Sequence, residues 1–186
     1  MTIDGFIAGP IGEMDWMVWD WDDKLKQYVA DLTEPVDCIV LGRKLAQGFI
    51  PHWANVASNA DDPEQAAGKK FTDTNKVVFT KTLDNADLIV AAWKNTVLAK
   101  GELVKEINRL KEQKGKDIIA YGGATFVSKL IKHRLIEEFH LFINPAAIGN
   151  GMTIFSELES KQNLTLVKST SFDCGIVVLN YKLKQN

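Results

Sequence analysis

Short apolar runs alternate with amphipathic segments along most of the chain, and this alternation constrains the fold more than any other feature. Runs bounded by turn residues predict strands at 1–9, 38–42, 76–82, 88–90, 118–121, 139–145, 164–172 and 175–183. Apolar residues at helical spacing predict helices over 24–32 and 101–115 and through 126–131, and a further helix is expected after the turn that begins at Gly42. Strands that alternate with helices predict an α/β fold with a mainly parallel central sheet, to which the last two strands add an antiparallel edge.

The polar stretch at 54–75 holds few large apolar side chains and predicts an excursion over the surface. It is too short to mark a second domain. A chain of 186 residues is also the right size for one well-formed core. We therefore expect a single domain over residues 1–186.

Charge and cysteine usage narrow the class of protein. The chain carries 22 Lys and Arg against 24 Asp and Glu, so its charge gives no reason to expect nucleic acid as a partner. No basic amphipathic run suits a membrane surface, and no apolar run approaches the roughly 20 residues that span a bilayer. Cys38 and Cys174 form no metal or redox motif, and His52, His133 and His140 have no common ligand spacing. We expect no metal, reduced thiols and a cytoplasmic protein.

Three strand-to-helix junctions carry groups that suit phosphates. Gly42–Lys44 comes after the apolar run "CIVL", Thr80–Thr82 after "KVVF" and Gly122–Thr125 after "IIAY". Ligands of open α/β sheets bind beyond the carboxyl ends of the strands, where cations, hydroxyls and open backbone amides attract anions. Each junction alone also fits a solvated charge or a tight turn, and the glycine pair by itself is compatible with either interpretation.

The missing motifs narrow the kind of phosphate ligand. The chain has neither GxxxxGK[ST] nor GxGxxG, and no acidic residue stands about 20 positions beyond Gly122 to hold a ribose hydroxyl. The cations Arg43, Lys44 and Lys81 instead suit an additional phosphate. If the ligand is a nicotinamide dinucleotide, the charges favour NADPH over NADH.

An ordered set of segments resembles a known family. "TIDGFIAGPIGEMDW", "CIVLGRK", "KVVFTKT", "GKDIIAYGGATFVSKLI" and "LIEEFHLFINPAAIGNGMTIF" occur in the order of the dihydrofolate-reductase-like superfamily. The chain looks closest to the branch of the C-terminal reductase domain of bifunctional riboflavin-biosynthesis proteins, the RibD C-terminal domain. The resemblance implies a single three-layer domain and an NADPH-dependent reductase of a small heterocycle. The implied activity is similar to that of 5-amino-6-(5-phosphoribosylamino)uracil reductase.

The resemblance also implies site residues. Those expected to bind the cofactor are Gly42, Arg43, Lys44, Thr80, Lys81, Thr82, Gly122, Gly123, Ala124, Thr125 and Phe126. Those expected to line the substrate are Trp16, Trp19, Pro145, Ile148 and Gly149, with Asp15 and Asp4 as the catalytic acids. A homodimer through the C-terminal strands is a further implication.

Two departures from the family pattern keep alternatives open. Met1 falls inside the first family strand, so that strand is expected to be shortened. The helix positions near Lys26, Gln27 and Val29 lack the acid with which dihydrofolate reductases grip the pterin. The alternatives are a dihydrofolate reductase homologue with weak or altered activity and a non-catalytic NADP-binding module. Asp15 also fits a turn residue, Trp16 a packing aromatic and Thr125 a plain first-turn helix residue.

Overall fold

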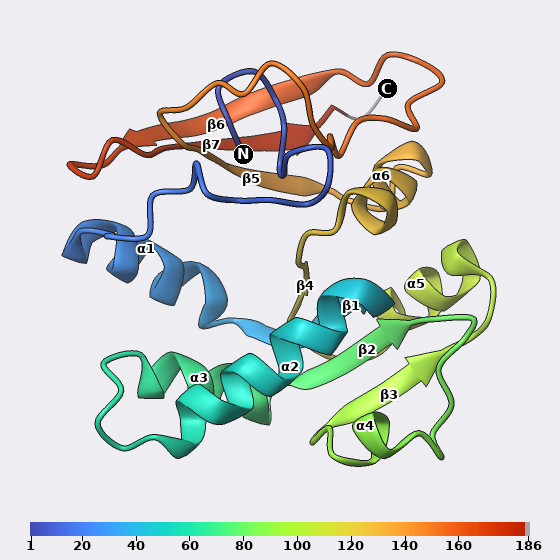
Figure 1. Cartoon of the computed structure of the whole chain (residues 1–186). Helices are drawn as coiled ribbons and strands as arrows, with labels where there is room; N and C mark the ends of the chain where they lie inside the picture. The colour runs from blue at the N-terminus through green and yellow to red at the C-terminus, as the bar shows by residue number, and fades with distance from the viewer. Residues whose placement is uncertain (185–186) are drawn as a thin grey trace. The chain divides into compact units, whose positions relative to one another are not determined.

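The computed structural model describes residues 1–184, which divide into two compact units. Residues 30–123 form one of them, called here the parallel unit. Residues 1–29 and the described residues from 124 onward form the other, called the antiparallel unit. Figure 1 labels the elements of both units. The prediction of a single domain over the whole chain stays a prediction.

The parallel unit is built on a four-stranded sheet in the order β3-β2-β1-β4, in which all neighbours run parallel. Its strands are β1 (Val36–Gly42), β2 (Asn75–Phe79), β3 (Thr96–Ala99) and β4 (Asp117–Ala120). Its helices are α2 (Arg43–Ser58), α3 (Gln65–Asp73), α4 (Leu88–Ala91) and α5 (Leu103–Lys111). Ile39 and Leu41 of the central strand lie in the buried core with Phe71 and Trp93.

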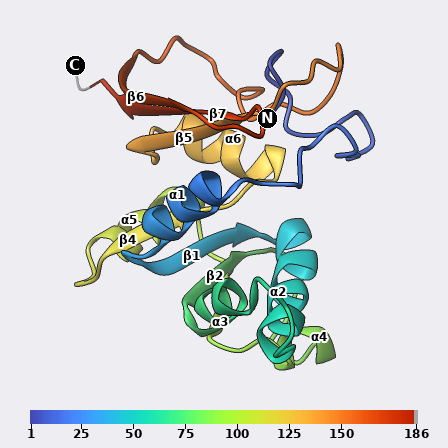
Figure 2. The same cartoon turned by 90° about the vertical axis from the view of Figure 1, so that its left-hand side faces the viewer.

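The antiparallel unit is built on a three-stranded sheet in the order β5-β7-β6. Its strands are β5 (Glu138–Ile143), β6 (Leu164–Ser171) and β7 (Val177–Leu183). Helix α6 (Ala124–Lys132) belongs to this unit, and α1 (Asp23–Thr33) begins in it. Figure 2 shows the three strands side by side. The α/β class and the antiparallel pair at the end of the chain are confirmed, with the difference that the antiparallel strands form a sheet of their own.

The two faces of β5 contribute side chains to two different apolar clusters. Phe139 packs in a cluster with Val127 and Ile131 of α6, as helical spacing predicts. Phe142 packs instead in a cluster that contains Leu25 of α1. Because successive strand residues point to opposite faces, α6 and α1 cover opposite faces of this sheet.

The prediction of a surface excursion at 54–75 is wrong. Helix α2 continues past Pro51 to Ser58, and α3 follows. Phe71 of α3 is buried, and its ring lies 4.5 Å from that of Trp53 in α2. Pro51 and the polar outer faces of α2 and α3 made this part of the sequence look irregular. The positions of the two helices depend on contacts between them.

The strand predicted near 88–90 is also wrong, because these residues begin the short helix α4. Val90 and Trp93 are both buried, and their spacing of three residues suits a helix rather than a strand. The next strand of the sheet is β3, at Thr96–Ala99.

Residues 1–9 form one isolated bridge, between Ala8 and Met152, where the sequence predicts a strand. A tight turn interrupts the segment: the Phe6 amide donates to the Thr2 hydroxyl at 2.9 Å, and Gly5 has a φ of +91°. The Met1 amine donates to the Phe142 carbonyl at 2.6 Å, at the end of β5. Strand pairing is therefore replaced here by turn and end-of-strand hydrogen bonds.

Candidate functional site

The three junctions predicted from the sequence lie at one edge of the parallel sheet. The register pairs Gly42, the last residue of β1, with Phe79, the last residue of β2. On the other side of β1, Val40 pairs with Ala120, the last residue of β4. The loops that follow these three neighbouring strands therefore begin side by side, which confirms that the predicted junctions occupy equivalent strand ends.

The junction after β1 places two cations at a helix start. Gly42 precedes α2 in an extended conformation and, as a glycine, offers no side-chain cap to the first amides of the helix. Arg43 and Lys44 occupy the first turn, and the Arg43 Nη1 donates to Gln47 Oε1 at 3.3 Å. Cations at this end oppose the helix dipole, whereas an anion bound there is favoured both by the dipole and by the two side chains. The local chemistry fits a phosphate.

The junction after β2 is shaped by Thr80. Its side chain is buried, and its hydroxyl accepts hydrogen bonds from the amides of Thr82 at 3.1 Å and Leu83 at 3.0 Å. Lys81 and Thr82 are exposed. The Thr80 hydroxyl thus builds the turn that presents the Lys81 ammonium and the Thr82 hydroxyl.

The glycine junction leaves room in front of its backbone. A Cβ added to either Gly122 or Gly123 would meet no atom within 4 Å, and Gly123 has a φ of +91°. Helix α6 starts at the next residue, with Thr125 exposed and no acidic residue in its first turn. Open backbone before a helix start free of negative charge fits a pyrophosphate. Phe126 is half-buried and packs in the apolar cluster of α6.

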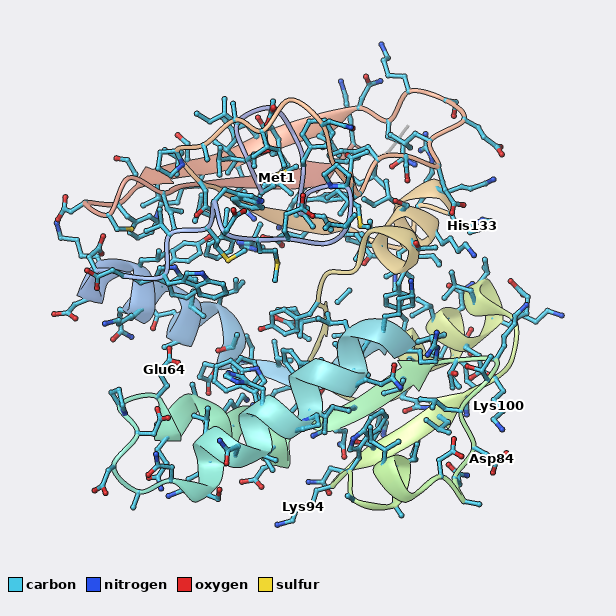
Figure 3. The ribbon with its side chains drawn as sticks, viewed as in Figure 1. Met1, Glu64, Asp84, Lys94, Lys100 and His133 are labelled. Carbon is cyan, nitrogen blue, oxygen red and sulfur yellow. The ribbon has the colours of Figure 1, made fainter. Side chains whose placement is uncertain are left out.

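The structure adds a fourth strand-end junction, after β3, that was not predicted from the sequence. Ala99, the last residue of β3, pairs with Phe79, so Lys100 lies at the same sheet edge. The Lys100 ammonium lies 2.8 Å from the Asp84 carboxylate and lowers the pKa of Asp84 (Figure 3). The sequence signal for β3 was the β-branched pair Thr96-Val97, between Asn95 and Lys100-Gly101. It was not used because a strand had already been predicted at 88–90.

In the antiparallel unit, Asp4 is bound to the loop at 145–151. Its Oδ2 accepts hydrogen bonds from the amides of Ile148 at 3.0 Å and Gly149 at 2.7 Å. The Thr2 hydroxyl and these amides lower the pKa of the Asp4 carboxyl. The structure thus brings Asp4 together with Ile148 and Gly149, three residues predicted for the site; Pro145 is exposed in the same loop.

The aromatic loop that precedes α1 is held by Asn144. This side chain is only 3% exposed, and its Oδ1 accepts a hydrogen bond from the Val18 amide at 2.9 Å. Asp15 is exposed and Trp19 is 68% exposed, whereas Trp16 is half-buried. The Trp16 indole N–H has no hydrogen-bond partner among the described residues. Sequence reasoning missed Asn144, for which the only signal was an amide before Pro145.

Other kinds of site find little support in residues 1–184. The described part holds no group of three His, Cys, Asp or Glu side chains that suits a metal ion. Cys38 and Cys174 are free thiols. Within the described residues, no helix combines the length and apolar character needed to cross a membrane.

Sequence comparisons find a family model and two relatives that match this chain. The family model of the RibD C-terminal domain matches residues 1–178. The uncharacterized protein YyaP of Bacillus subtilis is 31% identical over 183 residues, which cover 97% of this chain and 90% of YyaP. YwjB, a second uncharacterized protein of that organism, is 24% identical over 181 residues, covering 92% of this chain and 88% of YwjB.

Solved structures confirm the fold. A protein from Shewanella sp. PV-4, provisionally assigned to riboflavin biosynthesis, is 25% identical with a TM-score of 0.72 and covers 100% of this chain and 96% of its own. The Thermotoga maritima diaminohydroxyphosphoribosylaminopyrimidine deaminase/5-amino-6-(5-phosphoribosylamino)uracil reductase is 17% identical, with a TM-score of 0.65 over 99% of this chain and 54% of its own. Dihydrofolate reductase from Enterococcus faecalis, complexed with NADP(H), is 15% identical, with a TM-score of 0.56 over 95% of this chain and 89% of its own. The chain has a dihydrofolate-reductase-like fold.

Proposed function

This chain belongs to the RibD C-terminal domain family, and from that premise we propose that it is an NADPH-dependent reductase of a small heterocyclic substrate. The observation that carries the proposal is the register of the parallel sheet. It sets the β1, β2 and β4 junctions side by side at one edge, each with groups suited to phosphate. A dinucleotide, with several phosphates along its length, is a ligand that such a row of junctions suits.

The proposed cofactor contacts follow from what each junction offers. Gly122 and Gly123 leave the backbone open to the pyrophosphate, and the first amides of α6, at Ala124, Thr125 and Phe126, donate to its oxygens. When bound, the reduced nicotinamide supplies the hydride. The chain's own residues bind and orient the dinucleotide.

Charge supports NADPH over NADH. Arg43 and Lys44 stand at the start of α2, and Lys81 and Thr82 follow the turn that Thr80 builds next to it. NADPH differs from NADH by one phosphate, which these cations and the hydroxyl bind by charge-assisted hydrogen bonds. Gly42 keeps the turn between strand and helix free of a side chain.

The proposed substrate residues lie in the antiparallel unit. Trp16, Trp19, Pro145, Ile148 and Gly149 offer the apolar surface that a flat heterocycle needs. Asp15 is exposed and is the proposed proton-handling group. The name of the Thermotoga maritima relative supports a uracil with a phosphoribosylamino group as the first substrate to test.

The structure favours this substrate class over dihydrofolate. No acid stands at Lys26, Gln27 or Val29 of α1, and Asp22, about one turn before Lys26, is already engaged. Its carboxylate accepts hydrogen bonds from the amides of Leu25 and Cys174, both at 2.9 Å. A pterin would therefore lack its usual carboxylate partner on this helix.

Assembly and location complete the proposal. We place the protein in the cytoplasm, as the free thiols allow. A homodimer through the C-terminal strands is supported by Leu166 and Val167, which are 51% and 53% exposed on the edge strand β6. Its test is the oligomeric state in solution.

The experiment is a turnover assay with NADPH as reductant. The purified protein is mixed with 5-amino-6-(5-phosphoribosylamino)uracil or with dihydrofolate, and loss of reduced nicotinamide absorbance is followed together with product formation. We expect turnover with the uracil compound and little or none with dihydrofolate. Turnover with dihydrofolate alone would select the homologue with altered activity. NADPH binding without turnover of any pyrimidine or pterin would make the chain a binding module and overturn the reductase.

A further inference from the structure

We propose that Asp4 is a positioning residue that holds the centre of the 145–151 loop, in place of the proton-handling role predicted from the sequence. The inference rests on the proposed function in one respect: it takes this loop to close over the reductase substrate. The anchoring itself depends only on contacts within the antiparallel unit.

The first observation is the convergence of two consecutive amides on one oxygen. The amides of Ile148 and Gly149 donate to the same Asp4 Oδ2, at 3.0 and 2.7 Å. Gly149 has a φ of +74°, in the left-handed region that favours glycine, so the loop turns at this residue. Successive backbone amides arranged in this way form a small concave anion site. Here the anion is the chain's own carboxylate.

The second observation is that backbone hydrogen bonds hold the two ends of the loop. The Ile3 amide donates to the Ala146 carbonyl at 2.8 Å, and the Met152 amide donates to the Ala8 carbonyl at 2.8 Å. Gly151 packs so closely that a Cβ there would lie 2.3 Å from the Ala8 oxygen. Between these anchors, the side chain of Asp4 reaches the exposed centre of the loop.

The contacts of Asp4 also argue against proton donation. The Thr2 hydroxyl and the two loop amides lower the pKa of the Asp4 carboxyl, because they stabilise its ionised form. A group held ionised in this way has no proton to give at neutral pH. By contrast, its negative charge suits the role of a fixed acceptor for the loop.

Positioning predicts which change in kinetics each variant shows. In Asp4→Ala the two loop amides lose their shared acceptor, so Ile148 and Gly149, which are proposed to line the substrate, are no longer fixed. We expect KM for the heterocycle to rise about tenfold or more with a smaller change in kcat. In Asp4→Asn the amide oxygen still accepts both hydrogen bonds, so most of the activity and the pH profile of kcat are retained.

Chemical rescue adds a second arm to the test. Formate supplies the missing carboxylate to the two amides, and we expect it to lower KM in Asp4→Ala and to leave the wild type unchanged. Formamide, which is neutral, should rescue less. A proton donor predicts the opposite pattern: Asp4→Asn loses kcat as severely as Asp4→Ala, and one limb of the pH profile disappears. That result would overturn the inference.

Hydrogen exchange separates this inference from the proposed function. Amide exchange in the peptide that contains Ile148 and Gly149 is measured in the free protein, without cofactor or substrate. We expect faster exchange in Asp4→Ala and near wild-type exchange in Asp4→Asn, while the β5–β7 peptides stay unchanged. Unaltered exchange in Asp4→Ala refutes the anchor. If exchange changes as expected but the wild type reduces no substrate, the anchor stands and the proposed function fails.

Discussion

A Cβ on Gly68 of α3 would lie 2.6 Å from the backbone nitrogen of Ala57 in α2. This distance is far below an ordinary van der Waals contact, and the atom it meets is backbone, which cannot swing aside. The two helices, which Figure 1 shows next to each other, are therefore packed at a separation that requires glycine at position 68.

We predict that Gly68→Ala destabilises the protein although alanine is the better helix former. Separating α2 from α3 loosens the contact of Phe71 with Trp53, at a cost of about 1–3 kcal/mol in the free energy of unfolding. Gly48→Ala is the matched control, because a Cβ there meets nothing within 4 Å. It should stabilise by up to about 1 kcal/mol. Urea unfolding of both variants checks the pair, and equal effects of the same sign would contradict the packing described here.

These same residues show what the sequence does and does not reveal of the fold. Helix α5 was predicted because its apolar residues recur at helical spacing, a pattern local to the segment. Helix α3 was not, because its burial comes from a fit against α2 at Gly68, which no short-range pattern records. The strand predicted at residues 1–9 failed for a related reason, since a hydrogen bond between Thr2 and Phe6 closes a turn inside an apolar run.

The residues of the candidate site likewise divide into those that local sequence patterns predict and those that depend on contacts between distant segments. The cations Arg43 and Lys81 and the glycine pair were predicted from the chemistry of junctions after strands, which is local. Asn144 was missed because its partner, the Val18 amide, lies 126 positions away in the chain. The proposed anchoring role of Asp4 could not be predicted from the sequence either, since Ile148 and Gly149 are distant from Asp4 in the chain.

The two glycines before α6 should respond differently to alanine. Gly122 is not among the glycines with positive φ and has open space around it, so Gly122→Ala should change the free energy of unfolding by less than about 0.5 kcal/mol. The added methyl group nevertheless stands where we place the pyrophosphate, so NADPH affinity should fall at least about tenfold. Gly123→Ala, unlike Gly122→Ala, should destabilise the protein, by about 1–2 kcal/mol, because the φ of Gly123 is +91°. Thermal unfolding and calorimetric titration of both variants test this, and full NADPH affinity in Gly122→Ala would move the cofactor elsewhere.

Lys76 gives a stability prediction with a defined pH dependence. Its buried ammonium donates to the carbonyls of Phe71, Thr72 and Thr74, at 2.7 to 3.0 Å, at the end of α3. Lys76→Met removes these hydrogen bonds and should cost about 1–3 kcal/mol at pH 7.

Burial lowers the pKa of Lys76 from 10.5 to about 8 in the folded protein. Between these two values the unfolded chain binds more protons than the folded one, so the Lys76 contribution to stability rises with pH. The stability lost in Lys76→Met should therefore grow from pH 8 to pH 10. Urea unfolding of wild type and variant across this range measures it, and a constant difference would show that the pKa is not lowered.

Asp22 should make folding sensitive to acid. The amides of Cys174 and Leu25 lower the pKa of its carboxyl, so its contribution is complete above the pKa of the unfolded chain and is lost as pH falls through the folded value. Asn is as good a helix cap as Asp but does not titrate here. Asp22→Asn keeps an oxygen for the Leu25 amide but none for the Cys174 amide, so it should unfold at a lower temperature than wild type at pH 7. Because Asn does not titrate, the variant should lose less stability than wild type below pH 4. Parallel pH dependence in the two proteins would mean that Asp22 does not contribute to acid unfolding.

The most direct test of the proposed function is a calorimetric titration of the wild type and of Arg43→Ala with NADPH and with NADH. Gly48→Ala serves as the control, because its position is open and carries no proposed contact. We predict that the wild type and the control bind NADPH more tightly than NADH. In Arg43→Ala, NADPH affinity should fall about tenfold while the much weaker NADH binding changes less. A wild type that binds neither dinucleotide, or binds both equally well, would contradict the assignment of the parallel-sheet edge to NADPH.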